Sequence, residues 1–468
     1  MRPYAGIPDP GRAGLFVDEN AALLRRYRYI EERSFRILSG HFPGTGEWEA
    51  KHVIARHAWE DAQHTRALRE RIATLRVARR QVDEPPDERL VALMDEAARA
   101  ADTVELFAGI HLVIKAALIE SYRWHLETTN HVADFPTVRE LKIILQEEEE
   151  QMDWVHDAWP ELCDTPQKRE RAEAWMAHLQ TFLAAAGGIR GDQPTDGVQA
   201  APPRDTAPFY ISRHPQRDRR FQINFQFNEP GDPPAQTIPE KLIFMMRGRL
   251  NELAATECVA STIYEVDGQP FEFYLELARH MWDEARHSML GQAVIESLGH
   301  DVKEWPLRIG PGYSYLSVTP WERYAHLGLN IEQGMMKYPP GKREEYEWCR
   351  DVAKNPLAAM YQDYDWADEV YHTQVARRWI GSLFDNDPHK MREFARSAAQ
   401  KIAANTKQIA EIWHAKRAEG GMLGEGDPLP VSPERPANGA TPIPSEFAVP
   451  PELTLTKEEI EEDLKRGE

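Results

Sequence analysis

Two ten-residue stretches, half a chain apart, decide the fold of this protein: Arg56-His-Ala-Trp-Glu-Asp-Ala-Gln-His-Thr65 and Arg279-His-Met-Trp-Asp-Glu-Ala-Arg-His-Ser288. Both have the composition of a helix, and each places an acid three residues before a histidine, so that the two side chains share one helical face. The pairs are Asp61 with His64 and Glu284 with His287. The near-repetition predicts an internal duplication in which the repeated piece carries metal-ligand chemistry.

The bulk composition limits the class of protein. A chain of 468 residues has room for two to three domains. Its formal net charge of -20 argues against a nucleic-acid partner and against binding to an anionic membrane surface. The three cysteines, Cys163, Cys258 and Cys349, are too far apart for a zinc cage and make a disulfide framework unfavourable. Without an apolar signal segment or a membrane span, we expect a cytoplasmic location.

Helical periodicity dominates the chain, which predicts an all-α fold. A helical bundle is expected over 1–187 and a second over 240–418, with breaks at Pro and Gly between the helices. The segment 188–239 has the composition of a long linker, and the alternating run 220–227 predicts a short strand or hairpin arm within it. A tail over 419–468, rich in Pro and Gly, is expected to end in a short charged helix that starts at Leu453.

The second half contains the ligand inventory of a two-metal bundle, in which two helices give one Glu each and two give a Glu-x-x-His pair. The candidate ligands are Glu257, Glu284, His287, Glu332, Glu369 and His372. Glu257 and Glu332 stand among small and apolar neighbours, where a charge needs a partner. Four carboxylates neutralise two divalent ions, and imidazoles complete each coordination sphere. The alternative is that these polar residues are buried and pair with one another across a bundle.

This set of six resembles the ligands of the ferritin-like di-iron carboxylate superfamily. Asp283-Glu-Ala-Arg-His287 is similar to the motif of bacterial multicomponent monooxygenase hydroxylases. The resemblance implies two tandem ferritin-like four-helix-bundle domains joined by the long irregular linker. It also implies two iron ions, or manganese with iron, in the second bundle. Asp283 and Asp368, each preceding a ligand Glu, are then expected to orient ligand histidines.

The first half offers equivalent positions with altered chemistry. They are Glu32, Asp61, His64, Glu120, Asp153 and His156, with Glu31 as an alternative to its neighbour. Both Glu-x-x-His positions carry Asp, whose shorter side chain reaches a metal less easily. Three outcomes stay open for this half: two ions with altered geometry, one ion, or a degenerate copy that only supports the fold.

Two functions from different classes follow. The first is an oxidoreductase that activates dioxygen and oxidises a small organic substrate by hydroxylation, desaturation or N-oxygenation. The second is ferroxidase or iron-handling activity, or a metal-stabilised protein without catalysis. The sequence contains no flavin fingerprint and no iron–sulfur cysteine spacing. An oxygenase would therefore take electrons from a separate donor, from peroxide or from its substrate. A homo-oligomer is left open.

Overall fold

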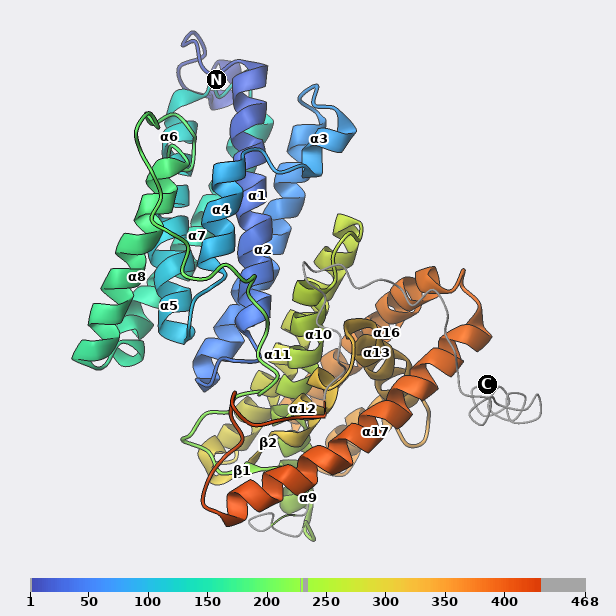
Figure 1. Ribbon diagram of the computed structural model, residues 1–468. Coiled ribbons are helices and arrows are strands. Elements are labelled where there is room, and N and C mark those ends of the chain that lie inside the picture. Colours follow the sequence, from blue (N-terminus) through green and yellow to red (C-terminus); the bar gives the residue numbers. More distant parts are fainter. Residues whose placement is uncertain (1, 228, 230–234, 431–468) are drawn as a thin grey trace. The chain divides into compact units, whose positions relative to one another are not determined.

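The computed structural model describes residues 2–227, 229 and 235–430 (Figure 1). It confirms the predicted all-α class. The run 220–227, expected to hold a short strand or hairpin arm, contains the two-residue strand β1 (Ile223–Asn224). It pairs in parallel with β2 (Leu307–Arg308), so it is a strand and not an arm of a hairpin. The expected charged helix at Leu453 lies outside the described residues. Among those residues, no helix combines the length and the apolar character that crossing a bilayer would require.

The chain divides into two compact units. The first comprises residues 1–41 and 56–210, and the second comprises residues 42–55 and 211–468. The segment 188–239, expected as a separate linker, is therefore shared between the two units and divides at Tyr210. A short piece from the first half of the sequence, residues 42–55, belongs to the second unit.

The first unit is built from helices that occupy the blue to green part of the chain (Figure 1). They are α1 (Val17–His41), the larger part of α2 (Trp48–Ala73), α3 (Arg79–Asp83), α4 (Glu88–Ala97), α5 (Thr103–Phe107), α6 (Ala116–Thr128), α7 (Phe135–Leu162) and α8 (Pro166–Ala185), after a 3₁₀ turn η1 (Tyr4–Gly6). Between α5 and α6 the chain is wound as a π-helix, η2 (Ala108–Lys115).

The second unit contains the helices of the light green to red part of the chain (Figure 1). Its helices are α9 (Ile238–Leu250), α10 (Leu253–Glu265), α11 (Phe271–Ser297), α12 (Gly310–Leu316), α13 (Pro320–Ala325), α14 (Gln333–Met335), α15 (Lys342–Asp351), α16 (Pro356–Leu383) and α17 (Pro388–Ala418), with a 3₁₀ turn η3 (Val302–Glu304). Between α13 and α14 lies a second π-helix, η4 (His326–Glu332). Each unit therefore contains a π-helical segment, and such segments are frequent at functional sites.

Local sequence explains where the helices of the second unit begin. Thr237 and Glu240 form a capping box at the start of α9. The helix α16 starts at Pro356, where the Asn355 side chain accepts a hydrogen bond from the backbone N–H of Ala358. Gly291 of α11 needs to be glycine, because a Cβ there would lie 2.6 Å from the carbonyl oxygen of Met246 in α9.

The packing of the second unit brings four helical runs together. α10 packs on α11, α11 packs on α16, and α16 packs on η4. Charged side chains from all four runs are buried between them. A buried charge is costly unless it is paired or binds a metal, so these residues form the candidate functional site.

Candidate metal centre

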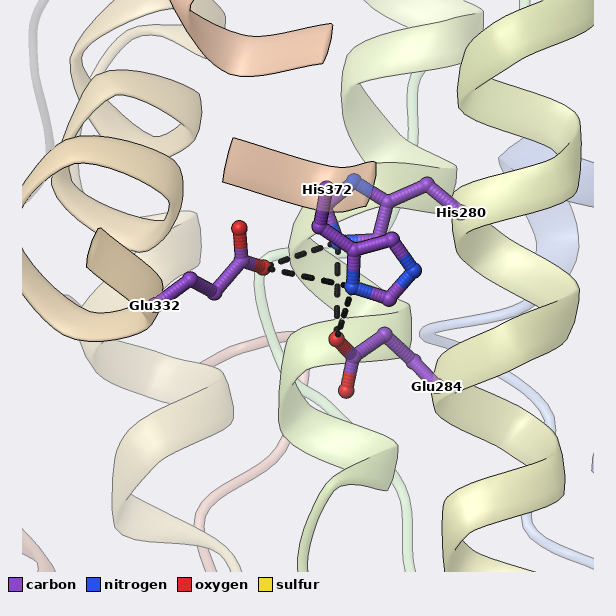
Figure 2. A group of neighbouring side chains, drawn as sticks. All are labelled: His280, Glu284, Glu332 and His372. Carbon is purple, nitrogen blue, oxygen red and sulfur yellow. Dashed lines mark hydrogen bonds and ion pairs between the residues drawn. The ribbon is translucent and has the colours of Figure 1, made fainter. Parts of the chain in front are cut away.

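Cluster A is a group of four buried side chains from three helical runs, with ligand atoms that all lie within 4.8 Å of one another (Figure 2). Its members are His280, Glu284, Glu332 and His372. The Nε2 atom of His280 lies 2.8 Å from Oε1 of Glu332. The Nδ1 atom of His372 lies 3.3 Å from Oε1 of Glu284. Two imidazoles and two carboxylates thus converge on one point.

Cluster B is a second group of four that meets the same distance criterion. Its members are Glu252, His287, Asp365 and Glu369. The Nδ1 atom of His287 lies 3.2 Å from Oε2 of Glu252 and 3.2 Å from Oδ1 of Asp365. Glu252 is the residue that immediately precedes α10, and the other three come from α11 and α16.

Glu284 links the two clusters. Its Oε1 atom lies 3.4 Å from Nε2 of His280 in cluster A, while its Oε2 atom lies 3.8 Å from Nδ1 of His287 in cluster B. One carboxylate thus presents an oxygen to each side. Glu284 could therefore contribute an oxygen to a metal ion at either cluster.

Second partners orient the three histidines. Nε2 of His372 donates to Asp283 at 3.3 Å, and Nε2 of His287 donates to Asp368 at 3.3 Å. The Nδ1 atom of His280 lies 3.4 Å from the hydroxyl of Tyr324. The nitrogen that faces the cluster is then Nδ1 in His287 and His372 and Nε2 in His280. A carboxylate that holds the far nitrogen of an imidazole is the usual support for a metal-ligating histidine.

Five buried atoms of the two clusters make no hydrogen bond within the described part of the chain. They are Oε2 of Glu252, Nδ1 of His287, Oε2 of Glu332, Oε2 of Glu369 and Nδ1 of His372. Buried polar atoms seldom lack a hydrogen bond in folded proteins, and a bound ion can take the place of the missing partner. The lone pairs of these five atoms are therefore available to metal ions.

The charges of the centre also fit two divalent ions. Clusters A and B together contain five carboxylates, and Glu345, which pairs with Arg249, adds a sixth. Arg249 and Lys342 are the two cations that contact cluster B. With the histidines neutral, six carboxylates face these two cations. Four negative charges remain, which two divalent ions would balance. Asp283 and Asp368 are offset separately by Arg279 and Arg286.

The pKa values respond to this surplus of negative charge. Burial is the largest effect on Glu369 and raises its pKa to about 7, with Lys342 opposing the rise and Glu284 adding to it. Burial alone would lower the pKa of His372, but its contacts with the carboxylates of Asp283 and Glu284 raise it to about 10. The raised pKa of His372 indicates that the carboxylates around its ring, whose Nδ1 faces cluster A, favour a positive charge there.

Of the six ligands expected in the second unit, five converge in the two clusters: Glu284, His287, Glu332, Glu369 and His372. Glu257 does not join them. Its Oε1 accepts a hydrogen bond from Nζ of Lys51 at 2.6 Å, and its Oε2 accepts one from Arg217 at 3.0 Å. The charge of Glu257 is thus satisfied by two buried cations, and Glu252 provides the carboxylate near α10 instead.

Three members of the clusters were missed by the sequence argument: Glu252, His280 and Asp365. Two of them carry a signal that spacing could have found. His280 precedes Glu284 by one helical turn, and Asp365 precedes Glu369 by one helical turn, so each shares a face with a predicted ligand. Glu252 lies in the break between α9 and α10, where helical periodicity gives no guidance.

The first unit has one comparable group, cluster C, consisting of Glu31, Asp61, His64 and Glu148. The remaining predicted positions do not join it. Glu32 pairs with Arg28, Glu120 is exposed and pairs with Arg123, and both members of the Asp153-x-x-His156 pair are exposed. The helix α7 instead contributes Glu148, which is buried within the acidic run 147–150.

A lysine occupies the centre of cluster C. Nζ of Lys115 donates to Asp61 at 2.6 Å and to Glu148 at 2.5 Å, and all three side chains are fully buried. Against burial, which is the largest effect, Lys115 and His64 hold the pKa of Glu148 below its ordinary value. The ammonium and the imidazole therefore offset the carboxylates of this cluster from within the protein.

Clusters A and C differ in the residues that stand at corresponding positions of the two units. Lys115 is the last residue of η2, as Glu332 is the last residue of η4. In the sequence, the distance from Lys115 to Glu332 equals the distance from Glu148 to Asp365. By that offset, Val155 stands in the first unit where His372 stands in the second. A cation and an apolar side chain thus replace two ligands of cluster A.

Comparisons of the chain with protein-family models, with curated proteins and with solved structures found no match. The chemistry of the site is therefore inferred from its geometry. Three imidazoles and five carboxylates, without a thiolate, form a donor set suited to iron, manganese or zinc. The clusters could hold metal ions of this kind.

Proposed function

We propose that the second unit is a ferritin-like four-helix bundle that holds two iron ions, or iron with manganese, and that the protein is an oxidoreductase that activates dioxygen. The observation that carries this proposal is Glu284, which presents one oxygen to cluster A and the other toward cluster B. The bundle would consist of α10, α11, the run from α13 through η4 to α14, and α16.

When bound, two ferrous ions would supply the electrons that reduce dioxygen for the oxidation of a small organic substrate. The residues of the chain would supply position and a dry environment. Asp283 and Asp368 hold two imidazoles in place, and burial of Glu284 and Glu332 keeps water from the centre. Hydroxylation, desaturation and N-oxygenation are all within the reach of such a centre.

We further propose that the first unit binds no metal ion, because Lys115 already provides the positive charge at cluster C. This narrows the expected metal content to about two ions per chain. Metal analysis of the wild-type protein, Glu284→Ala and Asp61→Ala tests both statements. We expect about two ions in wild type and in Asp61→Ala, and fewer than one in Glu284→Ala. Full metal content in Glu284→Ala would rule the centre out.

Oxygen uptake separates catalysis from iron handling. Protein loaded anaerobically with ferrous iron is mixed with aerated buffer, with and without a panel of small organic substrates. An oxygenase is expected to consume dioxygen faster with a substrate and to yield an oxidised organic product. Retention of ferric iron with no effect of any organic compound would favour ferroxidase activity. Metal binding that raises stability without oxygen uptake would favour a metal-stabilised protein.

A further inference from the structure

We propose that Lys342 is an internal counter-ion that holds the carboxylates of cluster B until a divalent ion displaces it, so that the two ions bind in a fixed order. Cluster A fills first, and cluster B fills only when the ammonium withdraws. This inference rests on the proposed two-metal centre and concerns how that centre is loaded.

Lys342 contacts three of the four members of cluster B. Its Nζ lies 2.9 Å and 3.0 Å from the two carboxylate oxygens of Asp365. It also lies 2.8 Å from Oε1 of Glu369 and 3.7 Å from Oε1 of Glu252. The side chain is buried, so these carboxylates and Arg249 make up its charged surroundings. The ammonium therefore stands among the oxygens that a metal ion at cluster B would use.

A divalent ion and this ammonium compete for the same atoms. Oδ1 of Asp365 accepts a hydrogen bond from Lys342 and also lies 3.2 Å from Nδ1 of His287, the nitrogen available to a metal. An ion bound between His287 and Asp365 would stand within a few ångströms of a like charge in a buried setting, where repulsion is weakly screened. Binding of the ion and withdrawal of the ammonium are thus coupled.

Cluster A has no such competitor. Among the described residues, no lysine or arginine pairs with any of its four members, and the contacts of Glu332 are with His280 and His372. A divalent ion at cluster A would therefore have no ammonium or guanidinium group to displace. This difference between the clusters sets the order of binding.

The position of Lys342 allows its ammonium to leave. It is the first residue of α15 and follows Gly341, so the side chain leans toward the N-terminal end of the helix and over the preceding segment. Its four-carbon stem can rotate without unwinding a helical turn. Withdrawal of the ammonium would release Oδ1 of Asp365 and Oε1 of Glu369, while Oδ2 of Asp365 would keep its contact with Arg249.

The test is an anaerobic titration of the full-length apoprotein with Mn²⁺, in which electron paramagnetic resonance counts the unbound ion. Wild type is compared with Lys342→Met, Lys342→Gln and the control Lys407→Met, which alters an exposed lysine on α17. In wild type and the control we expect one ion to bind at least ten-fold more tightly than the second. In both Lys342 variants the second ion is expected to bind at least ten-fold more tightly than in wild type, with the first unchanged.

Thermal unfolding gives a second readout. Without metal, Lys342→Met leaves the cluster B carboxylates without their counter-ion, so its Tm should lie below that of wild type, and saturating Mn²⁺ should restore most of the difference. An unchanged second affinity, or a loss of it, in both Lys342 variants would overturn the role of Lys342 while leaving the centre intact. Failure of wild type to bind two ions would instead refute the proposed function itself.

Discussion

Asp283 of α11 accepts a hydrogen bond from Nε2 of His372 on α16, at 3.3 Å, and Asp368 of α16 accepts one from Nε2 of His287 on α11, also at 3.3 Å. Each acid precedes the Glu of its own Glu-x-x-His motif but orients the histidine of the other motif. Arg286 binds both acids, so the four side chains and the arginine form one network between the two helices. The second nitrogen of each imidazole is thereby directed at the clusters.

Removal of these acids should weaken metal binding without removing a ligand. We expect Asp283→Ala and Asp368→Ala each to lower Mn²⁺ affinity by about ten- to a hundred-fold, because the imidazole loses its orientation and some of its basicity. Asp283→Asn should lower the Mn²⁺ affinity less than Asp283→Ala does, because the amide oxygen of Asn can still accept the hydrogen bond. Isothermal titration under anaerobic conditions measures the effect, with the exposed Asp363→Ala on α16 as control. Wild-type affinity in both alanine variants would contradict the role assigned to the acids.

The motifs on α11 and α16 could be predicted because helical spacing alone places an acid and a histidine on one face. His280 and Asp365 lie one helical turn before the predicted ligands Glu284 and Glu369, so helical spacing could have predicted them as well. The choice between Glu252 and Glu257 could not be made in this way. It depends on Lys51 and Arg217, which are far away in the sequence and neutralise Glu257 only in the folded unit.

The first unit shows the same limit more strongly. Asp61 and His64, which the repeat places on one helical face, both belong to cluster C, but the charge of that cluster depends on Lys115, which no motif in the sequence singles out. On α7, burial determines which residues can join the cluster: Glu148 is buried, whereas both members of the Asp153-x-x-His156 pair are exposed. Lys115 is the last residue of the π-helical segment η2, and no residue propensity predicts where such a segment forms.

Glu252 and Glu257 should behave differently when each is changed to Gln. Glu252→Gln removes a charged cluster B ligand, so we expect metal content to fall by about one ion per chain with little loss of stability. Glu257→Gln should keep both ions but lower the free energy of unfolding by about 3–5 kcal/mol, because Lys51 and Arg217 lose their buried partner. Metal analysis and urea unfolding distinguish them. The reverse pattern would restore Glu257 as the ligand.

Lys115 should be essential to the stability of the first unit. In Lys115→Met, Asp61 and Glu148 are left buried without their cation, and we expect a loss of about 3–5 kcal/mol in the free energy of unfolding. The double variant Asp61→Asn with Lys115→Met should recover much of this loss, because it removes one charge of each sign. Urea unfolding of both proteins, free of metal, measures the difference. Wild-type stability in the single variant would show that the ammonium is not needed there.

His125 should make the protein sensitive to acid. Its ring is buried, neither nitrogen has a hydrogen-bond partner in the described part of the chain, and burial lowers its pKa to about 4. Below pH 6.5 the unfolded chain takes up a proton at this histidine while the folded chain does not, so stability falls as the pH falls from about 6.5 to about 4. Above that range the residue contributes no pH dependence.

We expect His125→Phe to remove this contribution, which amounts to about 3 kcal/mol at the acid end. The measurement is the free energy of unfolding against pH for wild type, His125→Phe and His414→Gln, the last altering a histidine with a half-exposed side chain on α17. The difference between His125→Phe and wild type should grow steadily below pH 6.5, whereas a difference independent of pH would mean that folding does not change the pKa of His125.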